Sequence, residues 1–486
     1  MRTASEVSVS RQGGISHGSR YLFLLFGLLG LLLYSFLAIS SKGIWSDEAF
    51  SFGMIRHSFR DIWNLTAGDV HPPLYYYYLK IFLMLFGDGL ITARIASIIP
   101  FLFILLFGGW QLSRLFNGRT GALFMASFLA FPSILQYAYE VRMYSLAAAF
   151  VFANAVFAYR CGIFNKIPDW FWLVICSVGA AYTHDYAFLA IGLIDLLLLV
   201  ILIWKKRSGI KCWVASFVFM VLMYLPWCGK LLGQMKYKVE NEYWIKKITL
   251  KTICEYVYQA FRVQGFIYFA VFLAGAYFIL FIWALWKRYE KAVLSLAIPV
   301  LVAVIGIIVS IIVRPVFIFR YLAPSLWAFP VFAAIVLDHM LDTKKNNKLV
   351  VGILSVILLA GGINAAGWMV AENRVCENPL DKTWVDQQDC DMYLVICSKP
   401  HASTVLACFE QEKTIYITRR EAGDATPFSN IQPYASFCPQ GKERIILLLD
   451  KGENPSEKIP DGYSCSYKEQ IMEDDGCVFD VYELIP

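Results

Sequence analysis

The sequence predicts an all-α, multispanning membrane domain followed by a small soluble domain of α/β or mostly-β type. Of the 486 residues, 58% are hydrophobic and 16% are charged, whereas soluble proteins are about one quarter charged. Long apolar runs fill residues 21–370, and the composition becomes polar from residue 371 onward. The net charge of +6 is modest, and Lys and Arg cluster at the ends of the apolar runs. This distribution fits membrane topology and argues against nucleic-acid binding.

Eleven apolar runs are predicted to be transmembrane helices. They cover residues 21–41, 88–113, 120–139, 142–160, 168–183, 186–204, 212–229, 263–286, 291–313, 320–340 and 348–370. The tail at 1–20 is basic, and the first run lacks a small-residue cleavage site, so we expect a retained span. An odd number of spans places the two termini on opposite sides of the membrane. If the N-terminal tail is cytoplasmic, the short loops that are rich in Lys and Arg also fall on the cytoplasmic side, as the positive-inside rule requires. We therefore expect residues 371–486 outside, at the plasma membrane.

Two outer segments do not fit this simple pattern. The first outer loop, 42–87, contains short amphipathic pieces and the apolar stretch Leu74–Phe86, which is too short to cross a bilayer. We expect interfacial helices there. The outer segment 230–262 is basic but also carries acidic and aromatic residues. We interpret it as an interfacial flap.

The soluble domain, 371–486, contains five strand-like runs. They are Met392–Cys397, Thr404–Phe409, Thr414–Thr418, Ile445–Leu449 and Val478–Leu484. Seven of the twelve cysteines also lie here, at 376, 390, 397, 408, 438, 465 and 477. No pair is spaced as C-x-x-C, which argues against a zinc ribbon. An outer location permits disulfides, although buried thiols explain the same residues equally well.

Ionisable residues gather at the predicted outer ends of the spans, where they are costly and indicate a functional site. The set comprises Asp47, Glu48, Asp69 and His71 of the first outer loop, Glu140, Arg142 and Tyr144, His184 and Asp185, and Arg320 and Tyr321. A carboxylate can act as a general base, and arginine or histidine can hold a phosphate. Together they predict group transfer from a phosphate-bearing lipid to a hydroxyl acceptor.

Each residue also has a structural explanation. Asp47 and Glu48 could cap the helix that begins near Ala49, and Tyr75 could belong to an interfacial aromatic belt. Asp47, Glu48, Asp69 and His71 could hold a divalent cation, but their spacing is not diagnostic. We predict no metal requirement and no cofactor.

A family resemblance rests on Asp47-Glu48 combined with His71-Pro72-Pro73-Leu74-Tyr75-Tyr76. This pattern resembles the membrane glycosyltransferases of the GT-C fold, in the branch of the protein O-mannosyltransferases and the lipid A aminoarabinose transferase (glycosyltransferase families 39 and 83). Supporting motifs are 114–119, 139–144 and Arg320-Tyr321-Leu322. The resemblance covers most of residues 20–370 and leaves the C-terminal domain without a counterpart.

The resemblance implies a hexosyl- or pentosyltransferase that uses a polyprenyl-phosphate sugar donor and inverts the sugar. It implies that Asp47 is the base, supported by Glu48, and that Arg142 and Arg320 hold the phosphate. We predict that the other outer-end residues bind substrate: Asp69, His71, Tyr75, Glu140, Tyr144, His184, Asp185 and Tyr321. The expected partners are the lipid-linked donor, membrane lipid and an unidentified protein, lipid or glycan acceptor, but no nucleic acid.

Two other functions remain open. A transporter or flippase of lipid-linked saccharides could use the same charges to line a path, but it should place polar residues near the bilayer midplane. The centres of the predicted spans are largely apolar, and the main exceptions are Asn154, Asp195 and Asn364. A receptor-like or structural protein working through its Cys-rich domain would leave the charges of the first outer loop unused.

Overall fold

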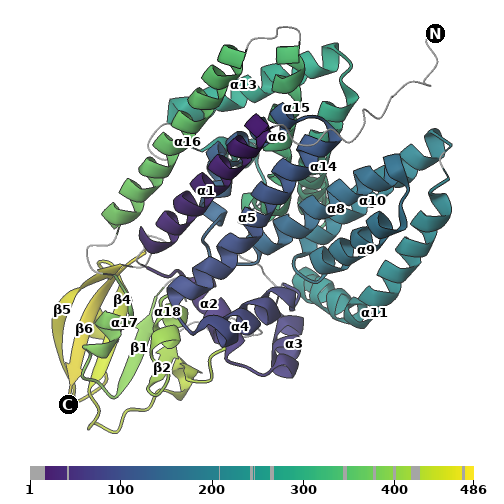
Figure 1. The fold of residues 1–486 in the computed structure, drawn as a ribbon. Coiled ribbons are helices and arrows are strands. Elements are labelled where there is room, and N and C mark those ends of the chain that lie inside the picture. The colour runs from purple at the N-terminus through teal and green to yellow at the C-terminus, as the bar shows by residue number, and fades with distance from the viewer. Residues whose placement is uncertain are drawn as a thin grey trace.

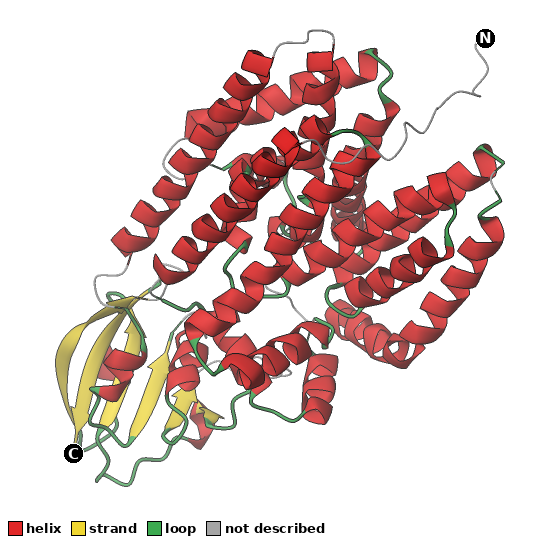
Figure 2. Ribbon diagram, in the orientation of Figure 1, coloured by secondary structure: helices red, strands yellow, loops and turns green. Residues whose placement is uncertain are grey.

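The structure is a computed structural model. It describes residues 17–40, 43–69, 71–206, 208–240, 245, 247–262, 267–342, 347–375, 379–397, 401–417, 427–472 and 477–486. A helical domain is followed by a C-terminal domain built on one sheet (Figure 2). The C-terminal domain lies at the end of the helical domain remote from the start of α1 (His17–Ser40) (Figure 1).

The helical domain follows the predicted order of segments. After α1 come α2 (Ser46–Ile55), α3 (Phe59–Gly68), α4 (Leu74–Phe86), α5 (Leu90–Leu115), α6 (Gly118–Ala130), α7 (Pro132–Tyr137), α8 (Tyr144–Phe164), α9 (Ile167–Ala181), α10 (Asp185–Trp204), α11 (Ile210–Glu240), α12 (Leu250–Phe261), α13 (Ile267–Trp286), α14 (Glu290–Ile312), the 3₁₀ helix η1 (Phe319–Ser325), α15 (Ala328–Asp342) and α16 (Asn347–Val375). Each of the eleven predicted spans falls on at least one of these helices.

Seven helices of the described chain are long and apolar enough to cross a membrane, and η1 with α15, bent by 53°, makes an eighth candidate. The chain is therefore a multi-pass membrane protein. The span predicted at 120–139 is divided, because α6 ends at Ala130 and α7 starts at Pro132. Proline lacks the amide hydrogen that a continuing helix needs and is favoured at a helix start.

The segment 42–87, predicted to be the first outer loop, forms short helices as predicted, and there are three of them in its described residues. α4 lies beside α2 and α3 at the end of the helical domain that faces the C-terminal domain (Figure 1). Lys80 of α4 donates to the carbonyl of Ile55, the last residue of α2, at 2.7 Å. The predicted flap, 230–262, comprises the last part of α11 and all of α12, while its residues 241–244 and 246 lie outside the described residues.

The C-terminal domain contains a six-stranded sheet, which confirms the predicted α/β type. Its strands are β1 (Met392–Ile396), β2 (Thr414–Ile417), β3 (Ile431–Pro433), β4 (Ile445–Asp450), β5 (Ser464–Met472) and β6 (Val478–Ile485), in the order β3-β2-β1-β4-β6-β5. The strands from β3 to β4 run parallel, and β6 is antiparallel to both β4 and β5. Two short helices, α17 (Lys382–Asp386) and α18 (His401–Phe409), complete it.

Residues 404–409 are helical, so the strand predicted there is wrong. Ala402, Val405 and Leu406 are completely buried, and their spacing of three and four residues is the period of a helix with one buried face. Of the seven cysteines in residues 371–486, Cys390, Cys408, Cys438 and Cys465 are free thiols. Cys376 lies outside the described residues.

Candidate active site

The first turn of α2 carries the two acids of the motif, and one of them explains why the helix starts here. The Glu48 carboxylate accepts the backbone N–H of Trp45 at 3.4 Å, which is the half of a capping box that a glutamate at this position supplies. Its other oxygen accepts the backbone N–H of Val141 at 2.8 Å, from the loop between α7 and α8. Glu48 is 2% exposed. It therefore fixes α2 against that loop and leaves the neighbouring acid to face outward.

Asp47 lies between two arginines from distant parts of the chain. Its Oδ2 accepts a hydrogen bond from Nη1 of Arg320 at 2.8 Å and lies 3.9 Å from Nη2 of Arg142. Arg142 also donates to the backbone carbonyl of Asp47 at 3.1 Å and to Oγ of Ser51 at 3.3 Å. The Asp47 side chain keeps 25% of its surface exposed. A small polar group can therefore reach this carboxylate.

The two arginines differ in their surroundings. The Arg142 side chain is 5% exposed. Burial lowers its pKa, but Asp47 and the nearby tyrosines raise the pKa by more, so that it lies well above the ordinary value. The Arg320 side chain is 24% exposed, and its guanidinium lies 5.6 Å from the centre of the Trp45 ring. Arg142 is thus a fixed cation, whereas Arg320 borders the accessible side.

Glu140 adds a third carboxyl group to those of Asp47 and Glu48. Burial, together with the charge of Glu48, raises the pKa of Glu140 to about 8, although Arg320 opposes the shift. Glu140 therefore holds its proton near pH 7, and a protonated carboxyl can donate a hydrogen bond. The backbone here is tightly turned, since the Arg142 N–H donates to the Glu140 carbonyl at 2.7 Å.

Two imidazoles and several tyrosines form an aromatic cluster beside the carboxyls. The rings of His71 and His184 are 5.0 Å apart, and Tyr321 lies 5.4 Å from His184. Nδ1 of His184 accepts the N–H of Tyr186 at 3.0 Å and caps α10. When this ring is neutral, its proton is therefore on Nε2. Tyr144 lies 5.8 Å from His184.

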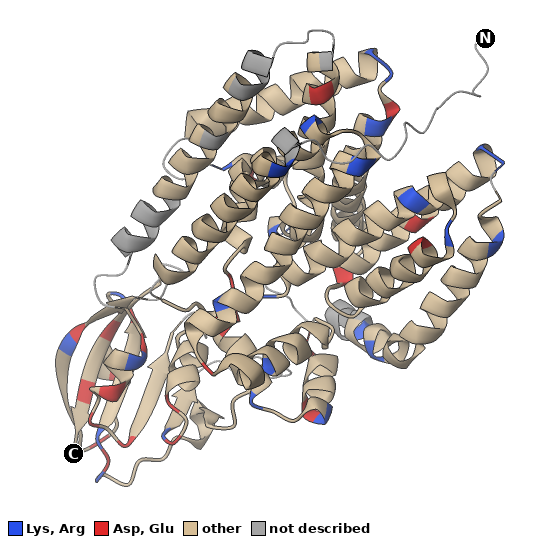
Figure 3. Ribbon diagram, viewed as in Figure 1, with Lys and Arg blue, Asp and Glu red and all other residues tan. Residues whose placement is uncertain are grey.

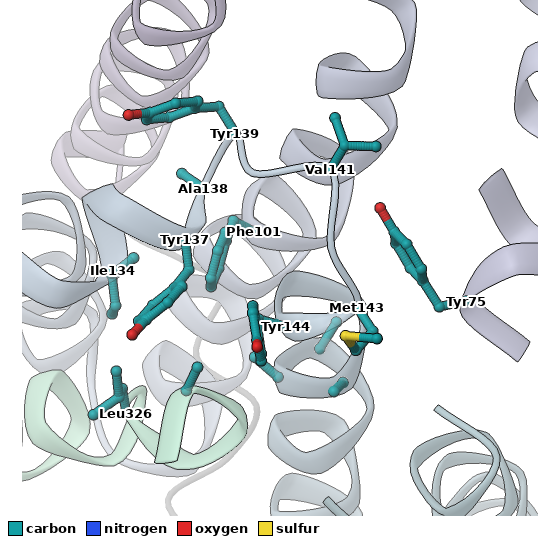
Figure 4. Close-up of a cluster of buried hydrophobic side chains, with 14 of the residues drawn as sticks. Tyr75, Phe101, Ile134, Tyr137, Ala138, Tyr139, Val141, Met143, Tyr144 and Leu326 are labelled. Atoms are coloured by element: carbon teal, nitrogen blue, oxygen red, sulfur yellow. The ribbon is translucent and has the colours of Figure 1, made fainter. Parts of the chain in front are cut away.

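The loop between α7 and α8 is supported by a buried apolar layer. Figure 4 shows Tyr75 facing Val141 and Met143 across this loop, with Tyr137 and Tyr144 close together below it. The rings of Tyr137 and Tyr144 are 5.2 Å apart. This packing holds the segment that carries Glu140 and Arg142.

Two predicted residues lie at the edge of the set. Asp69 caps the end of α3, and its charge acts on Arg142. Asp185 lies in the first turn of α10, and its charge acts on Tyr224 of α11. Asp69 therefore lies on the side toward Arg142, and Asp185 lies on the side toward α11.

Trp45, Ser51 and Tyr76 lie near Asp47 and were not predicted as site residues, and neither was Tyr186, which stacks on Tyr321 at 5.0 Å. Ser51 follows Asp47 by four residues, so the helical period alone places both on one face. Arg94 of α5 is 1% exposed and donates to the carbonyls of Ala38 and Gly43 at 3.1 and 2.6 Å. It joins α5 to the end of α1. Within the described residues, no group of three or more His, Cys, Asp or Glu side chains is arranged to hold a metal ion.

Comparison with known proteins identifies the fold. No protein-family model matches the chain, and no curated protein matches its sequence. The structure is similar to ArnT from Cupriavidus metallidurans in the apo state, with a TM-score of 0.65, 14% identity, and coverage of 96% of this chain and 98% of ArnT. ArnT bound to undecaprenyl phosphate gives a TM-score of 0.62 at 13% identity and coverage of 94% and 97%. The chain therefore has the GT-C fold that its sequence predicted.

Proposed function

We propose that this chain is a membrane glycosyltransferase that moves a sugar from a polyprenyl-phosphate donor to an acceptor hydroxyl. The observation that carries the proposal is Asp47, 2.8 Å from Arg320 and 3.9 Å from Arg142, with a quarter of its side chain exposed. The fold of ArnT, one structure of which holds undecaprenyl phosphate, supports a lipid-linked donor.

The two arginines are suited to the donor phosphate. A guanidinium offers paired N–H groups that match two phosphate oxygens. An arriving phosphate competes with Asp47 for Arg320, which is the more exposed of the two. Binding of the donor therefore loosens the ion pair of Asp47 at the moment when a base is needed.

The reaction that follows is an in-line displacement. Asp47 accepts the proton of the acceptor hydroxyl, and the hydroxyl oxygen forms a bond to the anomeric carbon of the sugar. The bond between that carbon and the phosphate oxygen breaks, which inverts the carbon and releases polyprenyl phosphate. Arg142 and Arg320 stabilise the negative charge that develops on the leaving phosphate.

The surrounding residues bind the substrates. His71, His184, Tyr144 and Tyr321 offer polar atoms and flat rings to the sugar, and Glu140, protonated near pH 7, donates a hydrogen bond to it. Glu48 positions the first turn of α2 through its two backbone hydrogen bonds.

The proposal places the site on the outer face of the plasma membrane and the N-terminal tail in the cytoplasm. Many Lys and Arg residues lie at the helix ends remote from the C-terminal domain (Figure 3), in support of this orientation. Single cysteines at the exposed positions Lys287 and Lys442, in a protein whose twelve native cysteines are all replaced by serine, test it. A membrane-impermeant thiol reagent should label Lys442→Cys from outside and Lys287→Cys only after the membrane is opened.

The decisive experiment compares wild type with Asp47→Asn in purified form. The donors are undecaprenyl-phosphate-linked hexoses and pentoses, cell-envelope membranes supply the acceptor, and the readout is released undecaprenyl phosphate. Loss of a general base lowers the rate by about 10²–10⁴-fold. Asp61→Asn is the matched control, because Asp61 is an exposed acid at the start of α3. Full turnover by folded Asp47→Asn would exclude Asp47 as the base. A flippase would instead move the donor across a vesicle bilayer without releasing undecaprenyl phosphate.

A further inference from the structure

The helix that carries Asp47 is clamped at its far end by the C-terminal domain. α2 has 10 residues, so at 1.5 Å per residue it is about 15 Å long. Its first turn carries Asp47 and Glu48, and its last turn packs against α18 and the segment at 427–428 (Figure 1). A helix this short moves as a rigid unit, so displacement of one end displaces the other.

Gly53 marks how closely the two domains approach. A Cβ atom at this position would lie 2.7 Å from Cζ of Phe428 and 2.7 Å from Cγ of Pro427, which is well inside van der Waals contact. Glycine inside a helix is unfavourable relative to alanine. The close approach to Phe428 accounts for a glycine at this place in the helix.

Two side chains that follow α2 make polar contacts with the same surface. Nη2 of Arg56 donates to the carbonyl of Cys408, in the last turn of α18, at 2.7 Å. A cation suits this position because the last carbonyls of a helix carry partial negative charge. Nε2 of His57 lies 2.7 Å from the carbonyl of Pro427, and a carbonyl can only accept, so this nitrogen carries a proton.

We propose that the C-terminal domain positions the Asp47 carboxylate through α2, with Gly53 and Arg56 as the positioning residues. The docked domain fixes the last turn, Lys80 of α4 holds the same end, and Arg142 holds the first turn. The distance between Asp47 and Arg320 is then set by contacts at both ends of α2. The C-terminal domain thereby determines the geometry around Asp47, although Asp47 belongs to the helical domain.

The first test is independent of catalysis. Hydrogen–deuterium exchange is measured over residues 45–51 in full-length wild type and in Arg56→Ala, Arg56→Lys and Gly53→Ala. Loss of the clamp should speed exchange there by about tenfold in Arg56→Ala, and Arg56→Lys should recover part of the protection. Arg60→Ala is the control, because Arg60 is also an exposed arginine and lies in the first turn of α3. Unchanged exchange over 45–51 in both Arg56→Ala and Gly53→Ala would overturn the proposal.

The second test rests on the proposed function. Release of undecaprenyl phosphate from the sugar-linked donors should show kcat reduced by about 10-fold to 100-fold in Arg56→Ala, since a small misplacement of a reacting group has this effect. KM for the donor should stay unchanged, because Arg142 and Arg320 are intact. A raised KM with unchanged kcat would contradict positioning. If wild type shows no turnover while Arg56→Ala still speeds exchange over 45–51, the glycosyltransferase assignment fails and the positioning role stands.

Discussion

Asp47 and Asp338 both pair with an arginine that is distant in sequence, at opposite ends of the helical domain. Oδ2 of Asp338, in α15, accepts from the side chains of Asn117 and Thr120 at 2.7 and 2.9 Å, and its Oδ1 accepts from Arg119. All three donors belong to the start of α6. Asp338 is 14% exposed, compared with 25% for Asp47.

The two carboxylates differ in how many segments converge on them. Asp338 is held by one helix start, where Asn117 also caps the backbone through the N–H groups of Arg119 and Thr120. It joins α6 to α15 and has a structural role. Asp47 meets arginines from the loop after α7 and from η1, and it remains accessible. Convergence of several segments on an accessible charge, and not the arginine–aspartate pair itself, distinguishes the candidate site.

Replacing Arg320, the partner of Asp47, or Arg119, the partner of Asp338, should distinguish a catalytic role from a structural role most clearly. Arg320→Ala should lower kcat/KM for the sugar-linked donor by about 10²–10³-fold, because one donor to the developing phosphate charge is lost. Arg119→Ala removes an arginine of similar exposure, 28% against 24%, and should leave kcat/KM unchanged. Release of undecaprenyl phosphate provides the measurement. Equal activity losses in the two variants would mean that Arg320 acts only through stability.

Loss of Asp338 should lower the stability of the protein more than loss of Asp47, which is the reverse of the expected order for activity. Asp338→Ala removes the carboxylate that accepts from the side chains of Arg119, Asn117 and Thr120, and loss of an acceptor costs about 1–3 kcal/mol for a buried group. We expect a fall in the melting temperature of several degrees in detergent, followed by tryptophan fluorescence, with turnover preserved at low temperature. Asp47→Asn should melt close to wild type. A stable Asp338→Ala protein would show that the cluster at α6 does not hold the bundle together.

The sequence predicted much of this arrangement. Apolar length predicted a helix at every span, and the distribution of Lys and Arg predicted the orientation of the spans. Span parity predicted that Asp47, Arg142, His184 and Arg320 share one face. The motif Asp47-Glu48 with His71 and two prolines predicted the fold. The motif at 114–119 was part of the same resemblance, yet its Asn117 and Arg119 have a structural role at the other end of the bundle.

Contacts between distant residues could not be predicted in the same way. Arg320 and Asp47 are 273 residues apart, and no local pattern specifies which of the arginines at the outer ends reaches the carboxylate. Glu48 bonds to a backbone N–H of another loop, a contact that leaves no signature in residue type. The β-branched Thr404 and Val405 favour the strand predicted at 404–409, but burial of one helical face outweighs that local preference, and these residues belong to α18.

Glu140 gives the smallest effect, and it tests whether the site carboxyls differ electrostatically from ordinary surface acids. Its pKa is about 8 in the folded protein, against 4.5 for an exposed glutamate. Between these pH values the folded protein holds a proton that the unfolded chain has lost, so stability falls as pH rises. Below about pH 4.5 both states are protonated and above about pH 8 both are ionised, so this contribution changes only between those limits.

Glu140→Gln keeps the shape of the protonated side chain and cannot ionise. We expect its melting temperature to match wild type at pH 5 and to exceed it by about 1–3 °C at pH 9. Glu290→Gln, at an exposed position in the first turn of α14, serves as the control and should follow wild type at every pH. Parallel curves for wild type and Glu140→Gln would mean that Glu140 is ionised in the folded protein. It could then not donate a hydrogen bond to the sugar, and the site would hold a third negative charge besides those of Asp47 and Glu48.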